Sequence, residues 1–360
     1  MSRRSQHNSA DTAVIRLVDA SANRASEGLR VVEDCVRFVL DDRHLTELCK
    51  RLRHDLAAAL AAVPFEQRLA ARETQADVGT ELTMPSERQR PDLESVLTAN
   101  FLRLEESLRS LEELGKIIDP DMAAQIRHIR YQSYTLHRAV HITRSSRQRL
   151  QGVRLQVLLD GRATPEEFDR LAQGLVAAGV GAIQLRDKTL DDRRLLDRAE
   201  RLRRWTAGTP TVLIVNDRPD LAALARADGV HLGQEDLPVK DARAIVGPGR
   251  LIGVSTHSIE QARQAVLDGA DYIGVGPTFP SGTKRFEHFP GVELLRAVAA
   301  EIGLPAFAIG GITRDNLPQV LAAGFTRVAV GGAIVSAEDP AGAAGEWVQE
   351  LVDKKMELEQ

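Results

Sequence analysis

Side chains that bind anions stand at alternate positions in the second half of the chain. Gln184, Arg186 and Lys188 follow the start of a short apolar run at Ala182. Because successive side chains of a strand point to opposite faces, these three are expected on one side, which in a closed barrel faces the axis. Two cations and an amide in a barrel mouth need an anionic ligand or barrel carboxylates, since an unpaired buried charge is costly. The spacing favours an anionic ligand over internal pairing.

Two aspartates follow the next two apolar runs, at positions where they could hold a divalent cation. Asp217 comes directly after Asn216, and Asp236 closes the segment HLGQED at 231–236. Each aspartate alone is more typical of a helix cap or a turn. As a pair beside two cations they indicate Mg²⁺, which keeps several waters and binds through one or two carboxylates and substrate phosphates. The sequence therefore predicts a Mg²⁺–polyphosphate site.

The fifth and sixth runs lead into segments rich in hydroxyl groups. Ser255 in GVSTH (253–257) could donate to a phosphate. His257 could transfer a proton, but no acid is placed to orient it, so a nucleophilic triad is not supported. The segment GPTFPSGTK (276–284) carries Lys284 among Gly, Pro, Ser and Thr, which is typical of a mobile lid with phosphate donors.

Paired glycines after the last two runs, at 310–311 and 331–332, indicate a second anion site. Such pairs let backbone N–H groups approach a phosphate, although one pair alone is also typical of a tight turn. A Mg²⁺-assisted site and a metal-free monophosphate site suggest that a pyrophosphorylated substrate is joined to a monophosphorylated one. Mg²⁺, Arg and Lys would stabilise charge on the departing pyrophosphate, and no protein nucleophile would be required.

Eight short β-rich runs position these residues, and helical patterns of roughly 10–16 residues separate them. Eight consecutive β/α units predict an α/β fold, a (β/α)8 TIM barrel with functional side chains at the carboxyl ends of its strands. A doubly wound open sheet is the alternative, but it rarely needs eight consecutive units. The expected strands are Leu155–Leu159, Ala182–Leu185, Thr211–Val215, Gly229–Leu232, Leu251–Val254, Tyr272–Val275, Ala306–Ile309 and Arg327–Val330.

The first half of the chain shows helical spacing instead. Its apolar stripes predict an all-α helical domain of about four long helices, with a looser segment from Pro64 to Pro91. The polar, basic stretch Thr143–Gly152 is interpreted as a linker. We therefore expect a helical domain at 1–150 that precedes the barrel at 151–360.

An internal repeat lies in the helical half. The segment RASEGLRVVED at 24–34 recurs as RLEESLRSLEE at 103–113. Arg and Glu three residues apart share one helical face, and a single copy is most simply a solvated, salt-bridged face. Two copies suggest duplicated hairpins whose charged faces meet across a pseudo-twofold axis or line a polar cleft.

Composition excludes several classes of protein. The 360 residues allow two domains or a barrel with an addition, and 43% hydrophobic residues supply a core. Aromatic residues make up only 4% and the net charge is −4, which argues against nucleic-acid partners. Cys35 and Cys49 are the two cysteines, too few for a disulfide framework. Without a bilayer-length apolar stretch or a signal peptide, we expect a soluble cytoplasmic enzyme with small-molecule substrates and no membrane partner. Whether it forms a homo-oligomer stays open.

With these motifs in place, residues 153–352 resemble thiamine-phosphate synthase. The resemblance implies transfer of a 4-amino-2-methylpyrimidin-5-ylmethyl group from its pyrophosphate to the ring nitrogen of a thiazole phosphate, through a carbocation-like pyrimidine. The products would be thiamine monophosphate and pyrophosphate. The motifs that carry it are QLRDK at 184–188, ND at 216–217, HLGQED at 231–236, GVSTH at 253–257, GPTFPSGTK at 276–284 and IGGI at 309–312.

The resemblance also implies roles for individual residues. Those expected to bind the pyrimidine pyrophosphate are Gln184, Arg186, Lys188, Asn216, Ser255 and Lys284, of which Arg186, Lys188, Ser255 and Lys284 would be catalytic. Those expected to hold Mg²⁺ are Asp217 and Asp236. Those expected to hold the thiazole phosphate are Ser281, Thr283, Gly311, Val335 and Ser336, the last three through backbone groups. Ser281 stands where Thr is common, and Gly331–Gly332 replaces bulkier residues at the edge of the thiazole pocket.

The helical half resembles an extension found on some members of this family, with RASEGLRVVEDCVRFVL at 24–40 as its hallmark. Such extensions have been linked to hydroxymethylpyrimidine-phosphate kinase activity, which would make the chain bifunctional. An oligomerisation module is the rival interpretation. For the barrel, the alternatives are a thiazole tautomerase, which binds only a thiazole phosphate, and a non-catalytic phosphate sensor or scaffold. Retention of both the aspartates and the cations favours the synthase.

Overall fold

The computed structural model describes residues 3–75, 77–78, 89–280 and 290–358. Contacts among residues divide the chain into two compact units, Met1–Val140 and His141–Gln360. The sequence places the domain boundary ten residues later, after 150. Among the described helices, none combines the length and the apolar character needed to cross a bilayer.

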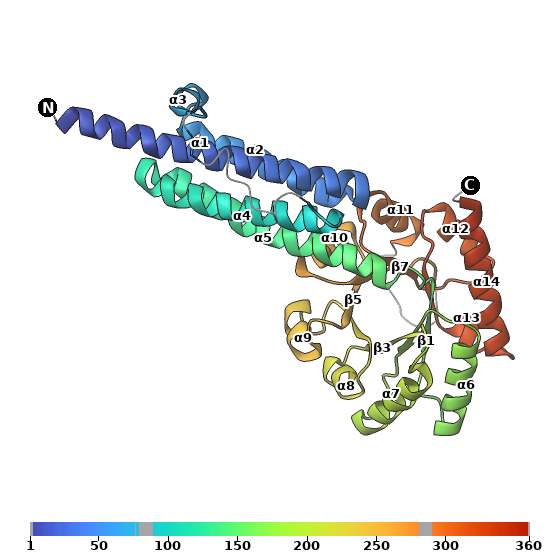
Figure 1. Ribbon diagram of the computed structural model, residues 1–360. Coiled ribbons are helices and arrows are strands. Elements are labelled where there is room, and N and C mark those ends of the chain that lie inside the picture. The colour runs from blue at the N-terminus through green and yellow to red at the C-terminus, as the bar shows by residue number, and fades with distance from the viewer. Residues whose placement is uncertain (1–2, 76, 79–88, 281–289, 359–360) are drawn as a thin grey trace. The chain divides into compact units, whose positions relative to one another are not determined.

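The second unit is a closed barrel of eight parallel strands, each paired with its neighbours in chain order, as predicted (Figure 1). Five of the predicted strands have the expected bounds. The third lies one residue later at both ends, the fifth extends two residues further, and the eighth begins one residue later. The strands are β1 Leu155–Leu159, β2 Ala182–Leu185, β3 Val212–Asn216, β4 Gly229–Leu232, β5 Leu251–Thr256, β6 Tyr272–Val275, β7 Ala306–Ile309 and β8 Val328–Val330.

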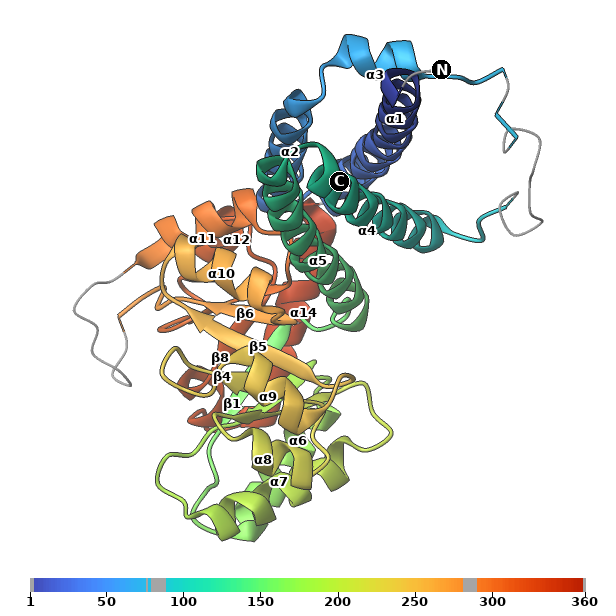
Figure 2. The same cartoon turned by 90° about the vertical axis from the view of Figure 1, so that its left-hand side faces the viewer.

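Helices lie on the outside of the strands (Figure 2). Local sequence signals begin several of them: Thr164 forms a capping box with Glu167, and the Ser258 hydroxyl caps the helix that follows it. The helices of this unit are α6 Pro165–Ala177, α7 Asp192–Thr206, α8 Pro219–Leu224, α9 Val239–Val246, α10 Ile259–Asp268, α11 Gly291–Glu301, α12 Leu317–Ala322, α13 Gly332–Val335 and α14 Pro340–Leu358.

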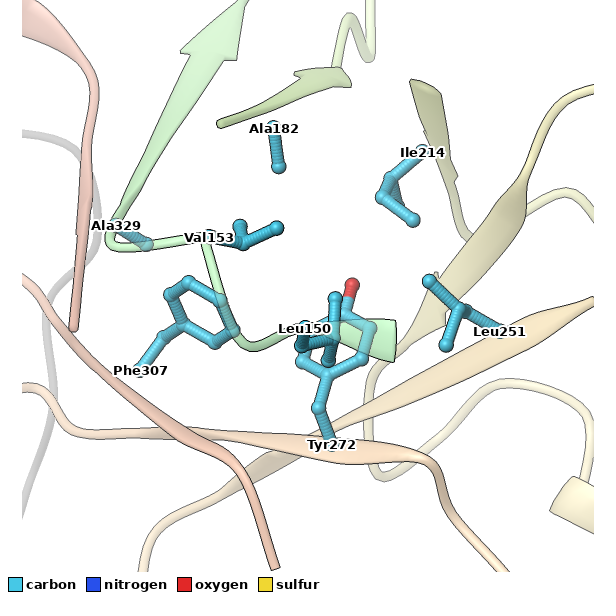
Figure 3. Close-up of a cluster of buried hydrophobic side chains, with 8 residues drawn as sticks. All are labelled: Leu150, Val153, Ala182, Ile214, Leu251, Tyr272, Phe307 and Ala329. Carbon is cyan, nitrogen blue, oxygen red and sulfur yellow. The ribbon is translucent and has the colours of Figure 1, made fainter. Parts of the chain in front are cut away.

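An apolar cluster fills the amino-terminal end of the barrel. Leu150 and Val153, which precede β1, meet side chains that converge from the strands, among them Tyr272 and Phe307 (Figure 3). The rings of Tyr272 and Phe307 meet edge to face with centroids 5.5 Å apart. Because this end is closed by packing, the polar side chains needed for chemistry are confined to the opposite end.

Thr143–Gly152 is not a linker over most of its length, because helix α5 continues to Arg149. Thr143 and Ser146 are fully buried, and the Ser146 hydroxyl donates to Asp271 Oδ1 over 3.1 Å. Arg147 Nε donates to the carbonyl of Gly303 over 2.6 Å. Small polar residues therefore form the buried face here, and a search for apolar periodicity does not detect it.

The first unit consists of helices, as predicted. Its long helices run beside one another (Figure 1). Helix α1 packs closely on α4, since a Cβ added at Gly28 would lie 3.0 Å from the Asn100 carbonyl oxygen. The short helix α3 lies inside the segment expected to be loose. The elements are α1 Arg3–Cys35, η1 Val36–Leu40, α2 Arg43–Ala59, η2 Leu60–Ala62, α3 Phe65–Ala71, α4 Leu93–Ile118 and α5 Pro120–Arg149, whose last turns belong to the second unit.

The repeat forms part of two similar helix pairs. The glutamate at the tenth position of each copy is buried and contacts an arginine of the next long helix: Glu33 with Arg53 at 3.0 Å, and Glu112 with Arg130 at 2.9 Å. The earlier Arg and Glu positions of both copies are mainly exposed. The solvated-face interpretation thus holds for most of the motif, and the buried glutamates tie each hairpin together.

Candidate active site at the barrel mouth

The two predicted metal ligands lie together at the carboxyl ends of β3 and β4. The carboxyl groups of Asp217 and Asp236 are within hydrogen-bonding distance, and burial followed by the proximity of Asp236 raises the pKa of Asp217. Lys188 Nζ lies 3.5 Å from Asp217 Oδ2. The Gly233 amide donates to Asp236 Oδ2 over 2.6 Å. Two carboxylates held this closely repel each other, and a cation between them would relieve that repulsion.

The backbone of Asp217 is itself unusual. Its φ of 60° is in the left-handed region, and its amide donates to the His231 carbonyl over 2.8 Å. A non-glycine residue is kept in that region only where surrounding contacts enforce it, and such residues concentrate at functional sites. This turn aims the carboxylate across to β4.

The donor set around the pair fits Mg²⁺ better than a metal held entirely by protein. No group of three or more His, Cys, Asp or Glu side chains in the described part of the chain could hold a metal ion. Two carboxylates leave most of an octahedral shell to water and substrate oxygens, as Mg²⁺ sites on phosphate substrates commonly do.

The cations after β2 are placed by Asp187, which sequence reasoning did not single out. Its carboxylate accepts from the amides of Gly161, Thr189 and Leu190 over 2.7–3.1 Å and from the Thr189 hydroxyl. Burial raises its pKa, but these hydrogen bonds outweigh burial and the pKa is lowered overall. The loop is thus fixed around Asp187, while the Lys188 side chain next to it is 67% exposed beside Asp217. The sequence signal for such a turn is an Asp whose side chain can accept from the backbone amide two residues later, here Thr189.

His231 is a second functional candidate that the sequence pattern did not reveal. Its Nε2 lies 2.9 Å from Ser255 Oγ, and its Nδ1 lies 3.1 Å from the Tyr272 hydroxyl. Burial, and then the positive charge of Arg186, lower the pKa of His231 to about 4, so the ring is neutral near pH 7. Its alternate position in HLGQED, two residues before Gly233, is the signal that it points into the barrel.

Glycines make room for this histidine. A Cβ at Gly253 would lie 2.1 Å from the Tyr272 ring and 2.5 Å from His231 Nδ1, and one at Gly274 would lie 3.2 Å from His231 Cε1. The His231–Tyr272 pair therefore occupies space that two neighbouring strands leave open.

The remaining pyrimidine-pyrophosphate candidates lie on the strands around this pair. Gln184 is buried in the barrel, where its side chain hydrogen-bonds to the Tyr272 hydroxyl. Asn216 ends β3 in register with His231. The carbonyl of Ser255 accepts from Gln234 Nε2, which links the loop after β4 to β5. His257 Nδ1 lies within hydrogen-bonding distance of the Gly276 carbonyl oxygen.

The thiazole-phosphate candidates lie around β6 to β8. Gly311 has φ 63°, and a Cβ there would lie 2.5 Å from the Phe279 carbonyl oxygen, so glycine is needed where the loop after β6 passes. The amides of Val335 and Ser336 donate to the carbonyls of Gly331 and Gly332 within the turn of α13. The candidates Ser281, Thr283 and Lys284 lie outside the described residues.

Comparison with known proteins identifies the barrel. The family model described as thiamine monophosphate synthase matches residues 155–334. A thiamine-phosphate synthase of Rhodopirellula baltica is 45% identical over 336 residues, which cover 91% of this chain and 90% of that protein. The chain belongs to the thiamine-phosphate synthase family.

Further relatives agree with this family membership. A thiamine-phosphate synthase of Gloeobacter violaceus is 43% identical over 344 residues, covering 96% of this chain and 98% of that protein. Among solved structures, a thiamine phosphate pyrophosphorylase from Pyrococcus furiosus is 35% identical with a TM-score of 0.51, covering 56% of this chain and 96% of that chain. The helical region has its own match, to the ThiD2 family over residues 16–139.

Membership in the thiamine-phosphate synthase family confirms the expected fold and enzyme class. The chain is a transferase of thiamine biosynthesis that joins a pyrimidine pyrophosphate to a thiazole phosphate. The tautomerase and scaffold alternatives are less well supported than this activity.

Proposed function

We propose that the barrel mouth binds the pyrimidine pyrophosphate and Mg²⁺ beside β2 to β4 and the thiazole phosphate beside β6 to β8. The observation that carries this proposal is the close pair Asp217–Asp236 with Lys188 at its edge. The two carboxylates would hold a divalent cation, which together with the lysine would supply positive charge to a pyrophosphate. In this assignment residues 151–360 perform the synthase reaction, and residues 1–150 form a separate helical domain.

In the reaction, the carbon–oxygen bond between the pyrimidine methylene and pyrophosphate breaks, and its electron pair leaves with pyrophosphate. The lone pair of the thiazole nitrogen then forms the new carbon–nitrogen bond, so no proton transfer is needed for the balance. Arg186, Lys188, Ser255 and Lys284 are assigned to the departing pyrophosphate as charged or hydroxyl donors. When bound, Mg²⁺ supplies further positive charge beside the pyrophosphate oxygens, with Asp217 and Asp236 as its protein ligands.

The other candidate residues bind and orient the substrates. Gln184 and Asn216 are assigned to the pyrimidine pyrophosphate. Hydroxyls of Ser281 and Thr283 and backbone groups of Gly311, Val335 and Ser336 are assigned to the thiazole phosphate. The Val335 and Ser336 amides already donate within α13, so a phosphate there would share those N–H groups. We propose that the enzyme acts on small-molecule substrates and that the reaction takes place in the cytoplasm.

The test uses the full chain with pyrimidine pyrophosphate and thiazole phosphate. Thiamine monophosphate and pyrophosphate should appear in equal amounts with Mg²⁺ and should fall to background with excess chelator. Turnover that persists without a divalent cation would contradict the metal assignment. Failure to form thiamine monophosphate with Mg²⁺ present would contradict the whole proposal.

A second activity is proposed for the helical unit, because it matches a separate family, ThiD2, over residues 16–139. In this proposal it transfers a phosphate from ATP to a pyrimidine monophosphate and so makes the substrate of the barrel. The Asp217→Ala chain separates the two reactions: given pyrimidine monophosphate, ATP and Mg²⁺, it should accumulate pyrimidine pyrophosphate without making thiamine monophosphate. If neither the wild-type chain nor the Asp217→Ala chain converts pyrimidine monophosphate to pyrimidine pyrophosphate, the helical unit is not a kinase.

A further inference from the structure

Arg218 follows the metal candidate Asp217 directly and connects two loops at the barrel mouth. Its Nη1 and Nη2 groups donate to the two carboxylate oxygens of Asp192, and the Nη2 contact measures 3.1 Å. Its Nε and Nη2 groups donate to the two carboxylate oxygens of Asp220, over 2.9 and 2.7 Å. One guanidinium thus makes a two-bond contact with each of two carboxylates.

These contacts leave Arg218 little capacity to bind a substrate. They use four of the five N–H groups that a guanidinium offers. The hydrogen bonds from Arg218 also lower the pKa of Asp192 and of Asp220, so both carboxylates are ionised near pH 7 and outnumber the guanidinium. Lys188, by contrast, has a side chain that is 67% exposed beside Asp217. Arg218 therefore joins parts of the protein and does not present a cation to a phosphate.

The two carboxylates stand at the beginning of the helices that follow β2 and β3. Asp192 is the first residue of α7, and the loop before it carries Lys188. Asp220 is the second residue of α8, and the turn before it carries Asp217. Arg218 thus ties the loop after β2 to the turn after β3. These are the two segments that meet where Lys188 Nζ lies 3.5 Å from Asp217 Oδ2.

The turn that carries Asp217 depends on support from its surroundings. Its φ of 60° is in the left-handed region, which a non-glycine residue keeps only where neighbouring contacts enforce it. On one side, the amide of Asp217 donates to the His231 carbonyl. On the other side, Arg218 is fixed by its side-chain contacts and by Pro219, which restricts the backbone of the residue before it. Loss of the Arg218 contacts would free that side of the turn and let the Asp217 carboxylate move away from Asp236.

The geometry of these contacts matters more than their charge. Single ion pairs at a protein surface contribute little, and Asp192 and Asp220 are exposed. Paired hydrogen bonds from a planar guanidinium, however, fix the orientation of each carboxylate as well as its distance. A lysine carries the same charge but cannot donate in parallel pairs to both carboxylates. The restraint therefore requires arginine.

We propose that Arg218 is a positioning residue for the cation site: it holds the loop with Lys188 against the turn with Asp217 and so keeps the groups that bind Mg²⁺ and pyrophosphate close together. The inference rests on the proposed assignment of Asp217, Asp236 and Lys188 to that site. Arg218 acts through these neighbours. Replacing a residue that orients metal ligands commonly weakens metal binding about 10- to 100-fold.

Four variants of the full chain test this role. Arg218→Lys keeps the charge and loses the paired donors, and Arg218→Gln loses both. Asp192→Asn weakens the same restraint from the other loop. Arg194→Gln is the matched control: Arg194 is an exposed arginine in the first turn of α7, and its guanidinium pairs with Asp191 of its own segment at 3.5 Å.

The Mg²⁺ concentration for half-maximal turnover is measured for each variant, together with the KM for the thiazole phosphate. Wild type and Arg194→Gln should have the same Mg²⁺ requirement. Both Arg218 variants should need at least about tenfold more Mg²⁺, and Asp192→Asn should shift in the same direction. The KM for the thiazole phosphate should stay within about twofold of the wild-type value, because that substrate is assigned to the other side of the mouth. Asp192→Asn added to Arg218→Gln should cause no further shift, since both changes remove one restraint.

The Mg²⁺ requirement separates positioning from a contribution to folding alone. Poorer folding would lower the amount of active enzyme, and hence the apparent kcat, without moving the Mg²⁺ concentration for half-maximal turnover. An unchanged Mg²⁺ requirement in both Arg218 variants would therefore overturn the inference. Wild-type turnover without any divalent cation would contradict the proposed cation site itself, and the inference with it, so the two failures are told apart by the wild-type measurement.

Discussion

His231 Nε2 lies 2.9 Å from Ser255 Oγ, and on the other side of the ring Nδ1 lies 3.1 Å from the Tyr272 hydroxyl. Burial raises the pKa of Tyr272, so its hydroxyl keeps its proton, and the side chains of Gln156 and Gln184 also hydrogen-bond to it. If the two amides donate to the Tyr272 oxygen, the Tyr272 hydroxyl donates to His231 Nδ1. The Nε2–H group of His231 then donates to Ser255 Oγ. We infer that this order leaves the Ser255 hydroxyl proton for a substrate oxygen.

Tyr272→Phe tests this chain of donors. It removes the partner of Nδ1 and leaves the neutral ring without a fixed tautomer, so Ser255 loses its orientation. We expect kcat to fall about tenfold, the value of one ordered hydrogen bond, with a much smaller change in the KM for the thiazole phosphate. Steady-state kinetics for each substrate provide the measurement.

Ser255→Ala is the reference for that experiment. If Tyr272 acts through Ser255, the double variant should be no slower than Ser255→Ala alone, because the two changes remove one function. Fully multiplicative losses would show that Tyr272 acts on the reaction by another route.

The depressed pKa of His231 makes stability depend on pH. The folded ring has a pKa of about 4 against 6.5 for an unperturbed ring, so between these values the unfolded chain binds the extra proton. The stability contributed by the neutral ring is complete above pH 6.5 and is lost as the pH falls toward 4, by up to about 3 kcal/mol. Urea unfolding at pH 7.5 and pH 4.5 measures the loss.

Other groups titrate over the same interval, so His231→Gln is the control. Glutamine cannot take up a proton here, and the variant should lose less stability between the two pH values than the wild type. Equal losses in both proteins would mean that the ring is not held neutral.

Sequence patterns predicted the features that depend on chain order. Strands of β-rich residues between helical stripes give the closed barrel, and residues after neighbouring strands must meet at its mouth, as Asp217 and Asp236 do. Contacts between residues that lie far apart in the chain could not be predicted from these patterns. His231 gains its role from Tyr272, 41 residues away, and α5 continues through Thr143 and Ser146 because the barrel buries them.

The residue roles that the family resemblance implies remain predictions. The glycine pair at 310–311 shows why: a pattern interpreted as a phosphate cradle is also required by the close passage of the loop after β6. Pattern alone does not separate these two reasons for a glycine.

Asp236→Asn tests the carboxylate pair through two effects of opposite sign. Burial, and then the neighbouring Asp236 carboxylate, raise the pKa of Asp217. Without metal, replacing Asp236 removes the repulsion between the two carboxylates, so the barrel should become more stable by about 1 kcal/mol. With substrates, the same change removes a ligand and should raise the Mg²⁺ concentration for half-maximal turnover at least about tenfold. Thermal unfolding in chelator and a Mg²⁺ titration of the rate give the two values. A variant that is less stable without metal and unchanged in its Mg²⁺ requirement would rule out a shared cation site.

Gly311→Ala separates the structural role of that glycine from its assigned role in phosphate binding. The residue has φ 63°, and an added Cβ would lie 2.5 Å from the Phe279 carbonyl oxygen and 2.6 Å from that of Pro280. Both atoms belong to backbone, so the loop after β6 must move, and we expect a loss of about 2 kcal/mol of stability together with a raised KM for the thiazole phosphate.

Gly332→Ala is the matched comparison, because a Cβ there meets nothing within 4 Å and the backbone is not left-handed. Its free energy of unfolding should stay within about 0.5 kcal/mol of the wild-type value. Any rise in its KM would therefore come from weaker binding of the phosphate and not from a destabilised barrel. Calorimetric unfolding and substrate titrations on both variants decide between the roles, and a Gly311→Ala barrel of unchanged stability would show that the loop after β6 yields without cost.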